Sequence, residues 1–328
     1  MRNAYIYINY NNIVVLKDYL DVIKTALEKL EYNCQYIKTL EGISKESLII
    51  YPMSKDALKY YLHGYHNFAI WQQGATADES FMRNHSKIRR FVLNQIDVFC
   101  MKKAKFILFV SEYMRKHYER LSKSNYSNKS YVMPCFNEVL DEEMLLQKDY
   151  SKNIFTYVGS LDLWQCFRET AKLYVEIENR VENCFFKVLT FQVDEAKSIL
   201  HEVGAKNYSV NCVPKEQVKN ELKECTYGFV IREDSIVNRV ATPTKISSYL
   251  SAGVIPIFSS CLKDFVNSVK GMKCAYVVDN EDIAGLVDFI CEKKNKKAIC
   301  NDICTLFDGY YNKSNHTVRI ENLLRSVL

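Results

Sequence analysis

Short apolar runs alternate with amphipathic stretches along the first 138 residues. Runs of three to six mostly apolar residues have the length of buried strands, and apolar positions spaced three and four apart predict helices. The expected strands are residues 4–8, 34–37, 48–51, 67–72, 106–110 and 131–133. The expected helices are residues 14–30, 55–62, 88–102 and 112–121, the last with Ser111 as its N-cap.

The alternation restarts after residues 139–152, a polar and acidic stretch without periodicity that we expect to be a linker. Beyond it, the expected strands are residues 154–158, 186–189, 208–212, 227–231, 254–258 and 275–278. The expected helices are residues 163–178, 194–203, 215–222, 243–251, 283–293, 296–309 and 317–327.

Strands that alternate with helices form parallel sheets covered on both faces. Two such blocks predict an α/β protein with two Rossmann-like domains facing a cleft, at residues 1–138 and 153–312. A terminal helix within 313–328 is expected to cross back onto the first domain. Ligands of such sheets bind beyond the carboxyl ends of the strands, so the loops found there are the candidates for chemistry.

Composition excludes several enzyme classes. The 328 residues include only ten glycines, and no two of them lie closer than ten residues. This spacing excludes the G-x-G-x-x-G dinucleotide loop and the P-loop. D-x-D and H-E-x-x-H motifs are also absent. Most NAD enzymes, P-loop NTPases, zincins and D-x-D transferases are therefore not expected.

The twelve cysteines form no C-x-x-C pair, and the closest two, Cys300 and Cys304, have no histidine nearby. This pattern favours buried structural thiols in a reducing cytosol over a disulfide scaffold or a zinc site. We expect no metal and no cofactor.

Positive charge is concentrated in residues 83–129. This segment holds twelve Lys or Arg and three acids, a net charge of +9, whereas the whole chain carries +5. The segment is either a set of solvated helix faces or a surface for anionic lipid, and no nucleic-acid-binding motif accompanies it. The first twelve residues lack a signal-peptide pattern, and no apolar run reaches about 20 residues. We expect a cytoplasmic protein, with peripheral attachment at the inner face of the membrane left open.

The loop after Ile231 carries the most chemistry. Thr242 is the expected N-cap of the following helix and Pro243 its first residue, so that Thr244 and Lys245 lie in the first turn. A helix N-terminus with these two side chains, together with Arg232 and Arg239, could hold a diphosphate without a metal. The alternative is an ordinary capped helix with surface cations.

Two further loops contain candidate groups. After Val158, Gly159 permits close approach of a ligand, Trp164 is a candidate wall of the cleft, and Asp162 with Gln165 has the spacing of a capping box. In the first half, residues 71–80 are read as a loop that offers Gln73 and Gly74 at a strand end. Glu79 on the same stretch is a candidate acid–base group, as is His85, for which a plain surface position is the alternative.

Several stretches of the sequence resemble those of a known family. The stretch Thr242–Pro256, TPTKISSYLSAGVIP, resembles the P-x-K-x-x-E-Y-L-x-x-G-x-P stretch of glycosyltransferase family 4, and Tyr157-Val158-Gly159-Ser160 precedes it by about one Rossmann half. Phe109-Val110-Ser111-Glu112 resembles the family's strand-to-helix turn. The two halves are similar to the GT-B architecture. The resemblance implies a retaining transferase that takes a sugar from a nucleotide diphosphate sugar, needs no metal, and binds the acceptor with its first half.

Carried over by position, the resemblance places Gly159 and Ser160 near the donor phosphates and Thr244 and Lys245 on the diphosphate. It places residues 190–191 and 213–214, with Thr190 and Val213, beside the base. Gln73 and Gly74 stand where the family often has a histidine, so they are expected near the transferred sugar.

Two departures from the family pattern stand out. Both glutamates of the family's E-x7-E pair are replaced, by Val240 and Ser248. The usual Arg and Lys pair after the first strand of the donor domain is also missing, and Gln165 stands near the place of the lysine. Phosphate neutralisation would then fall on Lys245, Arg232 and Arg239.

We therefore predict a glycosyltransferase that builds a surface polysaccharide or glycolipid on a saccharide or lipid-linked acceptor. A nucleotide-sugar epimerase is the enzymatic alternative. A non-catalytic GT-B-like subunit that partners an active transferase is the other, and the missing glutamates favour it.

Overall fold

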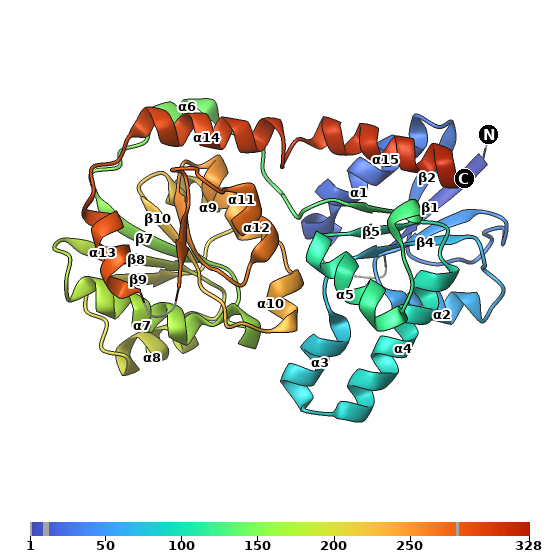
Figure 1. The fold of residues 1–328 in the computed structure, drawn as a ribbon, viewed down its shortest axis with the longest axis horizontal. Helices are drawn as coiled ribbons and strands as arrows, with labels where there is room; N and C mark the ends of the chain where they lie inside the picture. Colours follow the sequence, from blue (N-terminus) through green and yellow to red (C-terminus); the bar gives the residue numbers. More distant parts are fainter. Residues whose placement is uncertain (1, 9–12, 280–281) are drawn as a thin grey trace. The chain divides into compact units, whose positions relative to one another are not determined.

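The computed structural model describes residues 2–8, 13–279 and 282–328. It divides into two compact units, each built on a six-stranded parallel sheet (Figure 1). Unit 1 comprises Met1–Asn137, Val240–Thr242 and Asn312–Leu328, and unit 2 comprises Glu138–Arg239 and Pro243–Tyr311. The predicted α/β class with two Rossmann-like domains is confirmed.

The sheet of unit 1 has the strand order β2-β1-β3-β4-β5-β6. Its strands are β1 (Arg2–Tyr7), β2 (Tyr32–Ile37), β3 (Leu48–Tyr51), β4 (Phe68–Gln72), β5 (Ile107–Phe109) and β6 (Ser130–Val132). Its helices are α1 (Ile13–Glu28), α2 (Ser54–Tyr61), α3 (Thr76–Asn84), α4 (Lys87–Lys103), α5 (Glu112–Ser122), the 3-10 turn η1 (Ser127–Lys129) and α15 (Lys313–Val327). Ser111 caps α5 as predicted, because its hydroxyl accepts the N–H of Met114 at 2.9 Å.

The sheet of unit 2 has the strand order β12-β11-β10-β7-β8-β9. Its strands are β7 (Asn153–Val158), β8 (Cys184–Leu189), β9 (Tyr208–Asn211), β10 (Tyr227–Val230), β11 (Ile255–Ser259) and β12 (Tyr276–Val278). Its helices are α6 (Glu142–Gln147), η2 (Leu163–Gln165), α7 (Phe167–Glu178), α8 (Val193–Glu202), α9 (Lys215–Leu222), α10 (Ile236–Val240), α11 (Thr244–Ser251), α12 (Lys263–Ser268), α13 (Ile283–Cys291) and α14 (Lys296–Asp308).

Strands β3 and β4 of unit 1 and β10 and β11 of unit 2 are buried along their whole length, as expected for sheets covered on both faces. In unit 2, α11 packs closely on β10. A Cβ at Gly228 would lie 2.4 Å from a ring carbon of Tyr249, so only glycine fits there. The Tyr249 hydroxyl accepts the N–H of Val158 at 3.0 Å and so ties α11 to the end of β7.

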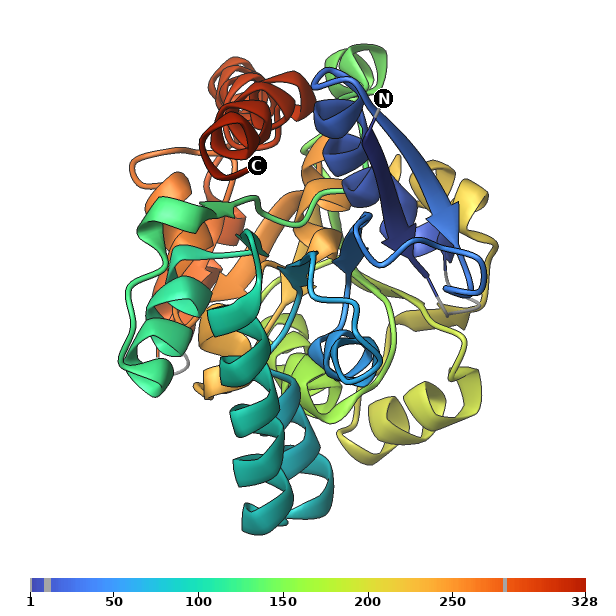
Figure 2. The same cartoon turned by 90° about the vertical axis from the view of Figure 1, so that its right-hand side faces the viewer.

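The C-terminal helix belongs to unit 1, as predicted. It packs on α1 and β6 (Figures 1 and 2). His316 on α15 is buried, and its Nδ1 lies 2.7 Å from the hydroxyl of Tyr131 in β6.

Four short helices differ from the sequence prediction, which reads loops or linker at α3, α6, α10 and α12. Each is short, and α3 buries only Ala77 and Asp78. A helix with so few buried apolar positions leaves no 3.6-residue pattern in the sequence. As a result, Glu79 lies in the first turn of a helix and the predicted linker contains α6.

Candidate functional site

The strand order of unit 2 places a topological switch point between β7 and β10. From β7 the chain proceeds outward through β8 and β9, and it then returns to β10 on the other side of β7. Loops at such a point leave a crevice at the carboxyl ends of the strands. Gly159 follows β7 and Arg232 follows β10, so two predicted site residues flank this crevice.

Lys245 points to the same place from α11. Its Nζ lies 4.0 Å from the centre of the Tyr157 ring and 3.4 Å from where a Cβ on Gly159 would be. The Nζ atom is buried and has no hydrogen-bond partner among the described residues. Burial lowers the pKa of Lys245 well below its ordinary value, and the charge of Arg232 lowers it further. An unsatisfied buried cation is costly, and an anion in the crevice would satisfy it.

Arg232 is also buried, and it is held in place by Gln165. One guanidinium nitrogen donates to the Gln165 carbonyl at 2.6 Å, and another donates to the Gln165 side-chain oxygen. Burial lowers the pKa of Arg232. Gln165 stands near the place where the resembled family has a lysine. Here it instead contributes oxygens that hold Arg232 from the neighbouring loop. Sequence reasoning did not anticipate this pairing, because the two residues are 67 positions apart.

The prediction that Thr242 caps α11 is wrong. The Thr242 hydroxyl instead accepts the N–H of Cys135 at 3.0 Å within unit 1, and Pro243 occupies the N-cap position without a side-chain cap. The helix therefore begins at Thr244, and its first-turn N–H groups are left without a capping side chain. Thr244 and Lys245 are its first two residues.

The turn after β7 also differs from prediction. Gly159 has φ +131°, a conformation that favours glycine. The side chain of Asp162 accepts from the Ser160 hydroxyl at 2.8 Å and caps no helix, so the predicted capping box is wrong. Trp164 lies half-buried on the short turn η2, and α7 begins only after Cys166, whose φ is +50°.

The loops after β8 and β9 contain the residues predicted beside the base. Thr190 is buried, and its hydroxyl accepts the N–H of Gln192 at 3.2 Å. The Gln192 side chain in turn accepts the N–H of Leu161 at 2.7 Å, which joins this loop to the turn after β7. Phe191 is 71% exposed, and Val213 is half-buried in the loop before α9.

Arg239, unlike Arg232, has an exposed side chain. Its exposed guanidinium pairs with the carboxylate of Asp234, with one N···O distance of 2.7 Å. This pairing lowers the pKa of Asp234. Arg239 is therefore already neutralised where it lies.

One group of possible metal ligands occurs in the part of the chain that the structure describes. Atoms of Cys166, Glu169 and Glu233 lie within 4.8 Å of one another. Burial raises the pKa of the Cys166 thiol, which is within hydrogen-bonding range of the carbonyls of Leu163 and Trp164. In the free protein the Cys166 thiol is therefore protonated and engaged by local partners.

In unit 1 the structure brings Gln73, Gly74 and Glu79 together beyond β4. The Glu79 carboxylate lies against Gly74, in the space that a Cβ at this position would occupy. The side chain of Gln73 donates to the carbonyl of Pro52 at 3.4 Å. His85 is exposed at the C-terminal end of α3.

The comparisons with known proteins identify the fold. No protein-family model and no curated protein matches this chain. Solved structures do. Sucrose-phosphate synthase from Thermosynechococcus elongatus has a TM-score of 0.70 and 10% identity, covering 99% of this chain and 98% of that one. Anabaena Alr3699/HepE, solved with UDP and glucose, has a TM-score of 0.68 and 10% identity, covering 99% and 100%. S. aureus TarM has a TM-score of 0.63 and 8% identity, covering 85% of this chain, which spans 56% of TarM.

The chain has the GT-B fold.

Beneath Gly74, the GT-B fold of this chain buries a polar network that sequence reasoning did not anticipate. The Gln72 side chain donates to the Gly74 carbonyl at 2.7 Å and to the Tyr118 hydroxyl at 2.8 Å. Tyr118 donates to the carboxylate of Asp97 at 3.0 Å. Burial raises the pKa of Asp97 to about 6. The network fixes the turn that carries Gln73 and Gly74.

Stability is therefore expected to depend on pH through Asp97. Because its pKa rises from 3.8 to about 6 on folding, the folded chain holds more protons between these values, and the free energy of unfolding falls as pH rises through this window. At 1.36 kcal/mol per pH unit the loss is about 3 kcal/mol. The Asp97→Asn variant should lack this loss of stability between about pH 4 and 6. Urea unfolding at pH 4 to 7 in a Trp164→Phe background, where Trp71 reports on unit 1, measures the difference. Parallel pH profiles of the two proteins would contradict the assignment.

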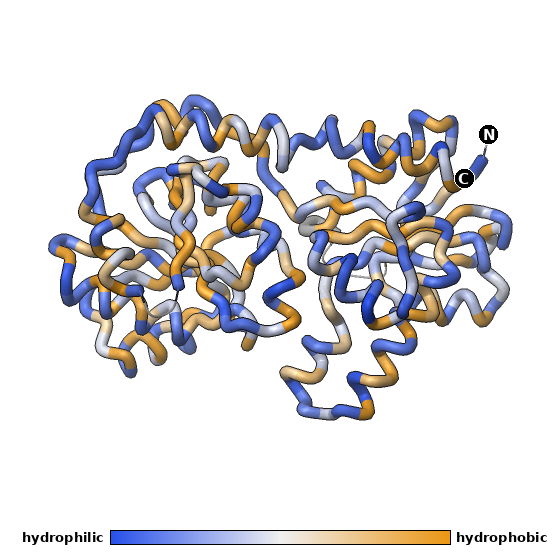
Figure 3. Tube along the Cα trace, in the orientation of Figure 1, coloured by the Kyte–Doolittle hydropathy of each residue, from blue (hydrophilic) through white to orange (hydrophobic). Residues whose placement is uncertain are grey.

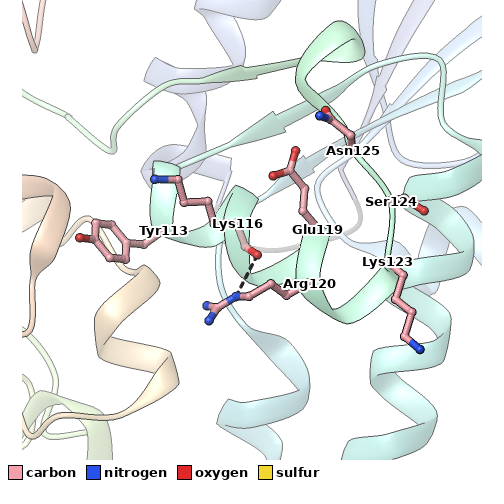
Figure 4. A pocket seen from close by; sticks show the side chains of 7 residues that line it. All are labelled: Tyr113, Lys116, Glu119, Arg120, Lys123, Ser124 and Asn125. Atoms are coloured by element: carbon pink, nitrogen blue, oxygen red, sulfur yellow. Dashed lines mark hydrogen bonds between the residues drawn. The ribbon is translucent and has the colours of Figure 1, made fainter.

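A basic hollow of about 600 Å³ opens on α5 and the loop that follows it (Figure 4). Lys116, Arg120 and Lys123 line it with a single acid, Glu119. The carboxylate of Glu119 is engaged by the N–H of Tyr126 at 2.9 Å. The hollow forms part of the basic segment 83–129 and could receive an anionic group.

None of the helices in the described ranges combines the length and the hydrophobicity needed to span a bilayer.

Proposed function

We propose that the chain is a glycosyltransferase that takes a sugar from a nucleotide diphosphate sugar. The observation that carries this proposal is the buried ammonium of Lys245, which has no hydrogen-bond partner among the described residues and lies at the switch point of unit 2 beside Gly159. A diphosphate is the anion that best fits a site with a buried lysine, a buried arginine and an uncapped helix N-terminus. The UDP-2-fluoro glucose named for a trehalose-6-phosphate protein from E. coli is a nucleotide diphosphate sugar of this class, and the UDP and glucose named for HepE are the two parts of such a donor.

These cations supply the charge that stabilises the leaving diphosphate, so transfer needs no metal in this proposal. The acceptor is a saccharide or a lipid-linked saccharide of surface polysaccharide or glycolipid synthesis, bound by unit 1 near Gln73, Gly74 and Glu79. Transfer of a hexose retains the anomeric configuration, as the resemblance to glycosyltransferase family 4 implies. We place the protein in the cytoplasm, peripheral to the inner face of the membrane.

The test is donor turnover in EDTA with a panel of UDP-, GDP-, ADP- and dTDP-sugars, followed by NMR. One donor should release its nucleoside diphosphate and free sugar slowly, and release should speed up when saccharide acceptors are added. The first-formed sugar should keep the donor's anomeric configuration. Release of a sugar epimer without any acceptor effect would favour the epimerase.

Binding without turnover of any donor would instead favour a non-catalytic partner subunit. A specific observation gives that alternative weight. Val240 and Ser248 stand where the resemblance places the two carboxylates, and hydrogen bonds within the protein engage the backbone carbonyl of Val240 and the hydroxyl of Ser248. The Val240 carbonyl accepts from the Ser111 hydroxyl at 2.7 Å, and the Ser248 hydroxyl lies 3.5 Å from the Thr244 carbonyl.

A further inference from the structure

The helical hairpin of α3 and α4 in unit 1 ends in a segment that the protein does not cover. The two helices pack on each other and extend away from the sheet (Figures 1 and 2). They are joined by His85 in a left-handed conformation and by Ser86, which caps α4 by accepting the N–H of Arg89 at 3.2 Å. From residue 79 to residue 96 no residue is buried, and burial resumes at Asp97.

This distal segment exposes an apolar face. Ile88, Phe91 and Val92 follow the helical spacing i, i+3, i+4 and are 79%, 64% and 49% exposed. Figure 3 shows apolar and polar residues mixed along the projecting hairpin. A soluble surface seldom leaves such a group of large apolar side chains together unless it contacts something.

The charge of the segment indicates which kind of partner it fits. Residues 80–96 contain Arg83, Lys87, Arg89 and Arg90 and no Asp or Glu. Arg90 pairs with Asp78 at 2.6 Å, whereas Lys87 and Arg89 are exposed beside the apolar face. The apolar face is flanked by cations, and the segment contains no acidic residue. Such a surface complements a partner that has an anionic outer layer and an apolar interior. A lipid bilayer with anionic headgroups has this arrangement.

We propose that the tip of the α3–α4 hairpin docks unit 1 on an anionic membrane. Ile88, Phe91 and Val92 enter the boundary between headgroups and acyl chains, and Lys87 and Arg89 bind the headgroups. This docking proposal rests on the proposed function only because a lipid-linked acceptor would give membrane docking a use. Vesicle binding is measured without donor or acceptor, so its failure and the failure of glycosyl transfer are distinguishable.

The experiment is co-sedimentation of the full chain with phosphatidylcholine vesicles, with and without about one third phosphatidylglycerol. We expect binding to the anionic vesicles, weakened about tenfold or more in Ile88→Ser/Phe91→Ser/Val92→Ser. Val139→Ser/Leu146→Ser/Val318→Ser removes three other exposed apolar side chains and should bind as wild type does. All these positions are exposed, so each protein should keep its thermal unfolding midpoint.

Charge is tested by a matched pair of variants. Lys87→Glu/Arg89→Glu should weaken anionic binding about tenfold or more, whereas Lys206→Glu/Lys270→Glu, with the same change in net charge, should not. Equal loss in both pairs, or no binding by wild type, would overturn the proposal. It would also be overturned if light scattering finds a wild-type dimer that the triple hairpin variant converts to a monomer, because the apolar face would then contact a second copy.

Discussion

Lys245→Met should remove most of the proposed glycosyltransferase activity while making the protein more stable. Methionine keeps an unbranched apolar side chain and lacks the ammonium, which in the free protein is buried without a hydrogen-bond partner among the described residues. Loss of a preorganised positive charge at a developing negative charge typically costs about 10²–10³-fold in kcat. In the absence of ligand, removing an unsatisfied buried polar group should stabilise unit 2 by about 1–3 kcal/mol, or roughly 2–4 °C for each kcal/mol.

Lys148→Met is the matched control. Lys148 is also a buried lysine of unit 2, but its Nζ donates to the carbonyls of Leu222 at 2.7 Å and Lys223 at 3.1 Å. Its loss leaves two carbonyls unpaired, so this variant should melt earlier and keep its turnover. If Lys245→Met lowered the melting temperature as Lys148→Met does, Lys245 would have a structural role and the proposed anion site would be wrong.

Arg232→Met should lower both stability and turnover. The substitution removes the donors that bind the backbone and side-chain oxygens of Gln165, and it leaves those oxygens beside a buried apolar group. Hydrogen bonds to charged groups contribute about 1.5–3 kcal/mol, so we expect a loss of about 2–4 kcal/mol. Turnover should fall by about 10²-fold, because the turn η2 and the cation at the switch point are both disturbed.

A double-mutant cycle with Gln165→Met separates these effects. If Arg232 acts through Gln165, the two substitutions should be non-additive in unfolding free energy by about 1 kcal/mol or more. Arg232→Lys should not restore stability, because one ammonium cannot reproduce two guanidinium donors. Additive losses would show that the pair is not coupled and that Arg232 is held by its other contacts.

Much of the fold can be predicted from local patterns of apolar and capping residues in the sequence. The strand at Leu48–Tyr51 is four consecutive apolar residues, and its predicted bounds match β3. Ser111 caps α5 because its own hydroxyl reaches the third helical N–H. Patterns confined to a few neighbouring residues can therefore be predicted without knowledge of the tertiary structure.

Other features depend on partners that are distant in sequence. Thr242 has the residue type and position of an N-cap, but its hydroxyl is taken by Cys135, 107 residues away. The sequence places Lys245 in the first turn of α11, and only the packing of Tyr157 and Gly159 buries its ammonium. The pairing of Gln165 with Arg232 and the network of Gln72, Tyr118 and Asp97 left no local signal.

The proposed diphosphate site at Lys245 is tested most directly by isothermal titration of UDP, GDP, ADP, CDP and dTDP, with the matching monophosphates, into wild type and Lys245→Met in EDTA. One nucleoside diphosphate should bind wild type and should bind Lys245→Met about 10–150-fold more weakly, the range expected for one charge-assisted hydrogen bond. The matching monophosphate should bind weakly to both proteins. Equal affinity of wild type and variant for the diphosphate, or no binding of any nucleotide, would contradict the proposed site.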